Sequence, residues 1–134
     1  MRRLLWPDAP EDELATELDV ILGDPSKYAV FVAEEDGRLV GFVEAALRDW
    51  AEGCATRPVG YVEGWYVRPE RRRAGVGRAL VEAAERWSAS KGCTEIGSDA
   101  EVSNTLSHAA HRALGFAEIE RIVAFAKPIG RRSP

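Results

Sequence analysis

A strand, a glycine-containing loop and a helix follow one another between residues 59 and 91, and this passage restricts the fold more than any other part of the chain. Residues 59–67 (VGYVEGWYV) are rich in β-branched and aromatic residues, which favour a strand. Residues 77–91 are predicted to be a helix, because apolar side chains repeat at helical spacing at Leu80, Ala84 and Trp87. A second strand is predicted over 93–99, and two strands separated by a helix are expected to pair in parallel.

The sequence ahead of this unit predicts a helix and a hairpin. An amphipathic stripe of apolar residues predicts a helix over roughly residues 10–22. The β-rich runs 28–34 and 39–47 flank the step Asp36-Gly37, which is a strong signal for a tight turn. These two runs are therefore expected to pair antiparallel.

Two further elements follow the unit. A helix is predicted over about 104–114, with Ser103 as its candidate cap, and a last strand over 118–127. The order of elements satisfies both kinds of pairing only in an α/β (α+β) fold with a mixed, mostly antiparallel sheet flanked by helices. We expect one domain over 1–134, with a frayed basic tail at 131–134.

Composition narrows the class of protein. The chain has 134 residues, 46% of them hydrophobic, so it can bury a core without disulfides or a metal. No stretch reaches the length of a membrane span, and the first ten residues lack a secretory signal, so a cytoplasmic protein is expected. Cys54 and Cys93 have no C-x-x-C spacing, which favours free thiols over a zinc site.

Charge is distributed unevenly along the chain. The net charge is -4, and the stretch 4–26 holds acidic residues without any Lys or Arg, whereas the loop 68–78 is strongly basic. An acidic balance argues against a broad nucleic-acid surface, whose affinity depends on basic contacts to phosphates. It suits a cationic partner instead.

The basic loop has the features of an anion site. Small residues at Gly75 and Gly77 let backbone N–H groups converge, and the start of the following helix adds its positive dipole end. The spacing does not match a P-loop, because Arg78 and Ala79 follow where Lys and Ser or Thr are needed. A dinucleotide fingerprint needs Gly or Ala where Leu80 stands.

The pattern Arg72-x-x-Gly75-x-Gly77, between a strand and a helix, resembles the acyl-CoA-binding motif of the GNAT N-acetyltransferase superfamily. Asn104 and the pair Gly115-Phe116 match the family's later motif, with ordinary helix capping as the alternative for Asn104. The predicted order of elements is also the family's order. The resemblance implies that acetyl-CoA is the cosubstrate. No metal is expected, because His108 and His111 lie one helical turn apart but no third ligand is evident. The resemblance also implies that these residues bind coenzyme A: Val67, Arg72, Arg73, Ala74, Gly75, Val76, Gly77, Arg78 and Asn104.

A narrower resemblance covers nearly the whole chain. The segments LLWPD (4–8), VGYVEGWYVRPE (59–70) and CTEIGSDAEVSNTLSHAAHRALGF (93–116) are similar to those of aminoglycoside 6'-N-acetyltransferases. This resemblance implies a homodimer that acetylates a primary amine of an aminoglycoside directly within a ternary complex, conferring antibiotic resistance. Relatives usually begin with a strand ahead of LLWPD, so the sheet is expected to lack its first strand unless the chain is truncated.

Two residues are candidates for the chemistry. A neutral amine must lose a proton as it attacks a thioester, and Glu63 is the candidate base because it interrupts an apolar strand. The face that Glu63 occupies depends on Gly64, since a glycine within a strand often marks a bulge. His111 stands where many family members carry a tyrosine that protonates the departing thiolate; a structural role for this histidine is equally open.

The remaining candidates are substrate contacts. By resemblance Asp99 binds an ammonium group, with helix capping as the alternative, and Glu120 lines the substrate site near the dimer interface. The aromatic residues Trp6, Trp50 and Tyr66 are candidates for walls against sugar rings, with core packing as the alternative.

Two rival functions stay open at this point. The first is a GNAT enzyme for another amine, such as a polyamine or a protein N-terminus. The second is a non-catalytic module that binds CoA or nucleic acid through the basic loop 68–78, which predicts salt-sensitive binding without acetyl turnover.

Overall fold

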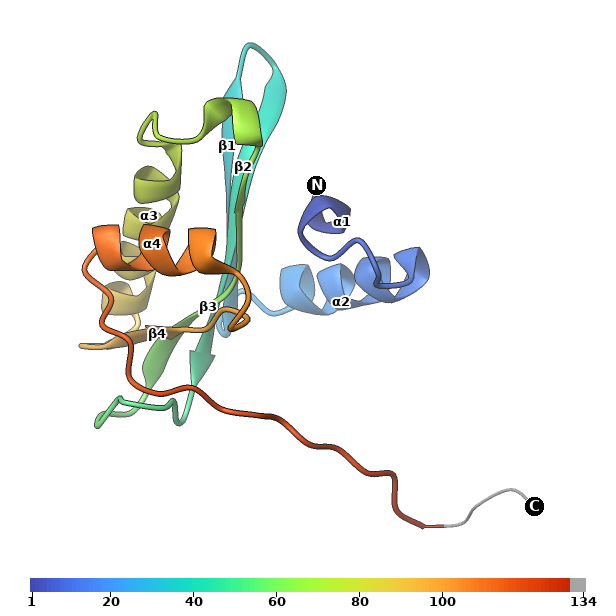
Figure 1. Cartoon of the computed structure of the whole chain (residues 1–134), viewed down its shortest axis with the longest axis vertical. Helices are drawn as coiled ribbons and strands as arrows, with labels where there is room; N and C mark the ends of the chain where they lie inside the picture. Colours follow the sequence, from blue (N-terminus) through green and yellow to red (C-terminus); the bar gives the residue numbers. More distant parts are fainter. Residues whose placement is uncertain (131–134) are drawn as a thin grey trace.

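A four-stranded mixed sheet forms the centre of the computed structural model, which describes residues 1–130 (Figure 1). The strands β1 (Tyr28–Glu35), β2 (Arg38–Arg48) and β3 (Val59–Val67) are antiparallel to their neighbours, and β4 (Ile96–Ser98) is parallel to β3. This arrangement confirms the predicted mixed, mostly antiparallel sheet. Within the described residues β1 is one edge of the sheet, as expected for a sheet without a strand ahead of the first helix.

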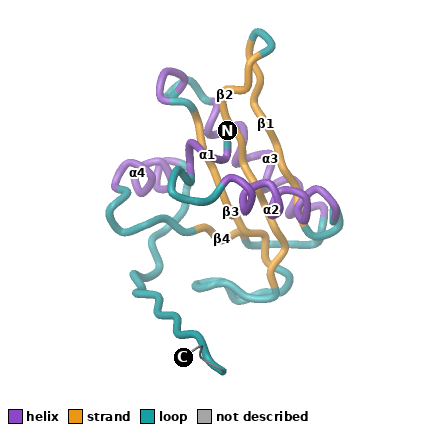
Figure 2. Tube along the Cα trace, turned by 90° about the vertical axis from the view of Figure 1, so that its right-hand side faces the viewer, coloured by secondary structure: helices purple, strands orange, loops and turns teal. Residues whose placement is uncertain are grey.

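Helices cover both faces of the sheet. Helices α1 (Arg2–Leu5) and α2 (Glu11–Gly23) lie on one face, and Figure 2 shows α2 crossing the strands. Helix α3 (Val76–Ser90) packs against the opposite face, and α4 (Thr105–Ala113) lies on the same side as α3. In the described part of the chain, no helix is long and apolar enough to cross a membrane.

The main core lies between α3 and the central strands. Val43 and Val62 from β2 and β3 are buried against Leu80 and Ala84 of α3, because the apolar positions of this helix share one face. Gly60 allows this approach: a Cβ at this position would lie 2.6 Å from the Cβ of Ser88. This contact joins the start of β3 to the end of α3. At the other end, Val67 and Leu80 belong to the same buried cluster, which fixes the end of β3 relative to the start of α3 on either side of the anion loop.

Several predicted boundaries differ from the structure. The strand predicted over 93–99 is reduced to three residues in β4, and Asn104 rather than Ser103 caps α4, accepting a hydrogen bond from the backbone of Ser107 at 3.1 Å. Helix α1 and the short 3-10 turn η1 (Pro69–Arg71) were not expected.

The last strand predicted over 118–127 is wrong for the single chain. The segment from 116 to 130 passes one end of the sheet and then extends away from the body, without pairing with any described strand (Figure 1). Val123 is 78% exposed and Phe125 93%. Its composition favours a strand, but a strand also needs a ladder partner, and β propensity alone does not supply one. The tail predicted at 131–134 lies outside the described residues.

Candidate active site

Glu63 lies on a β-bulge in the middle of β3. The residues of β2 that pair with Val62 and Gly64 are consecutive, so Glu63 has no partner in the ladder. A Cβ at Gly64 would lie 2.6 Å from the ring of Trp6, on the face that α1 covers, and Glu63 lines the cleft on that face. The bulge that Gly64 predicted is present, and it directs the Glu63 carboxylate toward α1 and α2.

The cleft between the sheet and the first two helices has a volume of about 380 Å³. Its walls combine apolar side chains with three carboxylates, namely Trp6, Val20 and Ile21 with Glu17, Glu44 and Glu63. A neighbouring hollow of about 470 Å³ also reaches Glu63 and extends along β2 to Arg48 and Asp49. Glu63 thus lines both hollows. The cleft of about 380 Å³, in which three carboxylates face one cation, Arg2, suits a cationic ligand with an apolar ring face.

Glu44 is a functional candidate that the sequence reasoning missed. Glu44 is 2% exposed. Its carboxylate accepts two hydrogen bonds from Arg2, with Nε 2.5 Å from Oε2 and Nη2 3.2 Å from Oε1. Arg2 also donates to the carbonyl of Leu14 at 2.8 Å, so the same guanidinium joins α1, α2 and β2. The signal was present, because Glu44 interrupts an apolar strand in the same way as Glu63.

Arg48 connects Glu63 to Asp99, and this residue was also missed. Its Nη2 lies 2.5 Å from Oε1 and 3.0 Å from Oε2 of Glu63, and its Cζ lies 3.5 Å from the centroid of the Tyr61 ring. The Tyr61 hydroxyl donates to Oδ2 of Asp99 at 2.5 Å. Two predicted site residues, Glu63 and Asp99, are therefore brought together through two residues that the motifs did not name.

The network shifts the proton affinities of its members. Burial and the hydrogen bond to Asp99 raise the pKa of Tyr61 well above its usual range, so the phenol stays protonated and donates. Burial of Arg48 opposes its charge, but the hydrogen bond and the negative charge of Glu63 outweigh it and raise the pKa of Arg48. Arg48 is consequently a permanent cation within the site.

The anion loop has the backbone geometry that its glycines predicted. Arg73 has φ 63° and Gly75 has φ 87°, so the chain passes twice through the left-handed region before α3. Gly75 is the N-cap of α3, and no side chain caps the helix there. The first N–H groups of α3 are consequently available to an anion.

Close packing holds the start of α3 against β3. A Cβ on Gly77 would lie 3.1 Å from the ring of Trp65, so a larger residue would push the helix away from the strand. Gly77 thereby brings the helix N-terminus next to the end of β3, as a cradle for a pyrophosphate requires.

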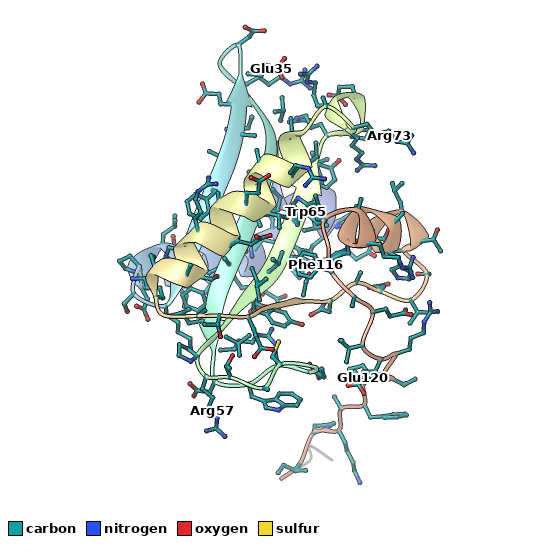
Figure 3. All side chains as sticks on the ribbon, turned by 90° about the vertical axis from the view of Figure 1, so that its left-hand side faces the viewer. Glu35, Arg57, Trp65, Arg73, Phe116 and Glu120 are labelled. Atoms are coloured by element: carbon teal, nitrogen blue, oxygen red, sulfur yellow. The ribbon has the colours of Figure 1, made fainter. Side chains whose placement is uncertain are left out.

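The arginines of this loop divide between two tasks. Arg72 turns back, donating from Nε to the carbonyl of Val67 at 2.9 Å, with its guanidinium 5.6 Å from the centroid of the Tyr66 ring. Arg78 donates to the carbonyl of Ala113 in α4 at 3.4 Å. All three side chains are exposed, and Arg73 extends away from the loop into solvent (Figure 3).

His111 lies at the junction of β4, α4 and β3. Its Nδ1 is 2.7 Å from the carbonyl of Ser107, which requires a proton on Nδ1, and its Nε2 is 2.8 Å from Oγ of Ser98. The rings of Trp65 and Phe116 each meet it edge-on with centroids at 5.2 Å (Figure 3). In the neutral ring Nε2 then accepts from the Ser98 hydroxyl and carries no proton, so proton donation from Nε2 requires the imidazolium form, either directly or through the hydroxyl of Ser98.

The other predicted contacts are scattered. Asn104 uses its Oδ1 as the cap of α4, leaving its amide N–H groups for another partner. Tyr66 lies near Phe42, with ring centroids 6.5 Å apart, while Trp50 is 64% exposed. Glu120 lies on the C-terminal segment, away from Trp65 (Figure 3). Among residues 1–130, no group of three or more His, Cys, Asp or Glu side chains is arranged to hold a metal ion.

The sequence that forms the cleft and the anion loop matches a known protein family. Residues 1–116 match the model of the acetyltransferase (GNAT) family.

The chain belongs to the GNAT acetyltransferase family.

Similar proteins narrow the position within the GNAT family. An aminoglycoside N(6')-acetyltransferase type 1 of Stenotrophomonas maltophilia is 47% identical over 131 residues, covering 96% of this chain and 84% of that protein. A protein of the same name from Klebsiella aerogenes is 43% identical, covering 96% of this chain and 87% of that protein.

A solved structure shares the fold closely. AAC(6')-Iy in complex with the bisubstrate analogue CoA-S-monomethyl-acetylneamine has a TM-score of 0.91 and 38% identity, covering 96% of this chain and 88% of that one. The GNAT fold and the predicted family are therefore confirmed.

Proposed function

We propose that this GNAT enzyme transfers the acetyl group of acetyl-CoA to the 6'-amino group of an aminoglycoside antibiotic and so confers resistance. The observation that carries the proposal is the bulge that directs Glu63 into an acidic cleft on the face opposite α3. The names of the relatives support the substrate, and so does the bisubstrate complex of AAC(6')-Iy. An aminoglycoside is a polycation with apolar ring faces, which matches the carboxylates and aromatic walls of the cleft.

The anion loop fits a coenzyme A pyrophosphate. The uncapped N-terminus of α3 offers backbone N–H groups, and Gly75 leaves open space where a side chain would otherwise stand, with nothing within 4 Å of an added Cβ. Backbone groups from Arg73 to Arg78 would hold the diphosphate, with Arg73 near its charge. Acetyl-CoA, when bound, would supply the activated acetyl thioester. The amide N–H groups of Asn104 are available to the pantetheine arm.

Glu63 would act as the general base. As the amine attacks the thioester carbonyl, its proton passes to Glu63 directly or through one water, and the coenzyme thiolate leaves. We assign Asp99 to an ammonium group of the substrate. We assign the imidazolium of His111 to protonation of the thiolate, directly from Nε2 or with the Ser98 hydroxyl as a relay. The acetyl group goes directly to the amine in a ternary complex, without an acetyl-enzyme.

Turnover and regiochemistry test this proposal. Acetyl-CoA consumption should depend on neamine or kanamycin, and an analogue with a hydroxyl at position 6' should not be acetylated there. Glu63→Gln should lose at least about a hundredfold in kcat, while calorimetry shows unchanged coenzyme A binding. Full activity of Glu63→Gln would overturn the base assignment, and turnover with polyamines or peptide N-termini alone would favour the rival GNAT function.

We further propose that the enzyme is a homodimer in which the segment 116–130 packs on a second copy. Apolar side chains along this segment are exposed in the single chain, namely Ile119, Ile122, Val123, Phe125 and Ile129. A Cβ on Gly53 would lie 2.6 Å from Ile119, so the first part of the segment packs against the loop after β2. A second copy bound to the segment would therefore border the substrate site.

Light scattering distinguishes the two states in solution. Phe125→Asp should yield monomers. Val102→Asp serves as the control, because Val102 is 52% exposed outside the segment. A wild-type chain that is monomeric at high concentration would contradict the dimer. We also place the enzyme in the cytoplasm, where its cosubstrate is made; fractionation of expressing cells tests this location.

A further inference from the structure

Arg48 occupies the position that a substrate ammonium group is expected to take. Its guanidinium contacts both carboxylate oxygens of Glu63, with distances of 2.5 and 3.0 Å from Nη2 and 3.3 Å from Nε to Oε2. It also lies 3.5 Å from the centroid of the Tyr61 ring, whose hydroxyl is bound to Asp99. A carboxylate and the face of an aromatic ring, here those of Glu63 and Tyr61, are two groups that commonly bind organic cations in proteins.

Arg48 contacts both carboxylate oxygens of Glu63. Arg48 uses two nitrogens on one carboxylate, which is the bidentate mode, and its charge cannot be removed by deprotonation near neutral pH. An amine that approaches the Glu63 oxygens therefore meets a like charge. The substrate can reach Glu63 only after the guanidinium has left.

Departure of Arg48 is a local motion. The Arg48 side chain is 39% exposed, and that of Glu63 is 32% exposed, so water can replace the lost contacts. The loop after β2 is held in place at its far end, where the backbone N–H groups of Ala55 and Thr56 each lie 2.8 Å from Oε1 of Glu95. Rotation of the Arg48 side chain, rather than movement of this loop, is enough to open Glu63.

We infer that Arg48 is a gate, an internal cation that closes the amine site in the free enzyme and is displaced by a substrate ammonium group. This inference rests on the proposed function of the Glu63 cleft. Displacement reduces the apparent affinity of every amine by the fraction of molecules in which Glu63 is open, and this factor is the same whatever the charge of the substrate. The gate therefore lowers the affinity for all amines and leaves the ratio of affinities between two amines unchanged.

The experiment compares Arg48→Met with Arg86→Met. Both changes remove one positive charge, and Arg86 is exposed on α3, on the opposite side of the sheet from the cleft. The probes are neamine and 6-amino-6-deoxyglucose, which carries a single amine. Steady-state kinetics with acetyl-CoA give KM and kcat, and calorimetry gives Kd for each probe on the coenzyme A complex without requiring turnover. High salt screens long-range charge effects.

We expect Arg48→Met to lower KM and Kd about five- to tenfold for both probes, since an exposed ion pair and a cation–π contact are replaced by the substrate. The two factors should be equal, kcat should stay within about twofold, and Arg86→Met should change neither constant. Arg48→Lys should lie between wild type and Arg48→Met, because lysine cannot bind in the bidentate mode.

Three results would overturn the gate. A rise in KM and Kd would make Arg48 a substrate-binding residue, and a fall in kcat with unchanged KM would make it a support for the orientation of Glu63. Unchanged constants would show that the ion pair opens without cost. Wild-type enzyme that binds neamine without acetylating it would refute the proposed function, but the calorimetric comparison of Arg48→Met would still decide the gate. If neither enzyme binds either probe, the gate is refuted too.

Discussion

Replacing Arg2 by methionine tests whether the acidic wall of the cleft is held by one buried ion pair. The side chain of Glu44 is 3% exposed and that of Arg2 is 13% exposed, with Nε 2.5 Å from Oε2. Methionine keeps most of the length of the side chain and removes the guanidinium, so the carboxylate is left buried without its counter-charge. Such a loss costs about 3–5 kcal/mol. We expect about 3 kcal/mol, the lower end, because the cleft beside Glu44 lets water reach the carboxylate.

The neighbouring arginine is a matched control. Arg3 lies on the same short helix and pairs with Glu11 at 3.2 Å, but the two side chains are 63% and 81% exposed. An exposed pair of this kind contributes less than about 1 kcal/mol. Arg3→Met should therefore leave the free energy of unfolding nearly unchanged, although its change in charge and size is the same.

Urea unfolding followed by tryptophan fluorescence measures both variants. About 3 kcal/mol corresponds to a fall in Tm of about 10 °C for a chain of this size. The double variant Arg2→Met/Glu44→Leu should recover at least half of the loss, because the buried charge is then gone as well. Equal unfolding free energies for Arg2→Met and Arg3→Met would refute the reasoning, since burial would then make no difference to the pair.

Two further predictions concern packing and pH. Gly60→Ala should lower the free energy of unfolding in urea by about 2 kcal/mol, because the added Cβ would meet Ser88. Adding Ser88→Gly should rescue this loss. Gly23→Ala is the control and should not destabilise the chain, because nothing lies within 4 Å of a Cβ added there. Hydrogen bonds from the side chain and backbone of Thr56 lower the pKa of Glu95 below its ordinary 4.5, so this stabilisation is complete above pH 4.5 and is lost as the pH falls through the lowered pKa. The difference in Tm between wild type and Glu95→Gln should shrink on acidification, and a difference that grows would contradict the assignment.

The sequence by itself determined the local elements and the anion loop. The strand 59–67 and the helix that follows have the periodicity of their structures, and the hairpin turn is specified by Asp36-Gly37. Gly75 takes a φ of 87°, a conformation that few other residues adopt without strain, so the loop could be recognised from residue types alone. These features depend on neighbours in sequence, and that is why pattern and spacing were sufficient for them.

Tertiary structure alone decided the surroundings of the candidate base. The bulge at Glu63 arises from the register of β3 against β2, and the contacts from Arg48 to Glu63 and from Arg2 to Glu44 span 15 and 42 residues. No local pattern encodes which charges meet across a sheet, because that depends on how strands and helices pack. The segment 118–127 shows the same limit. Its residues favour a strand, but pairing depends on how the chain packs, and in the described structure the segment pairs with no strand of the sheet.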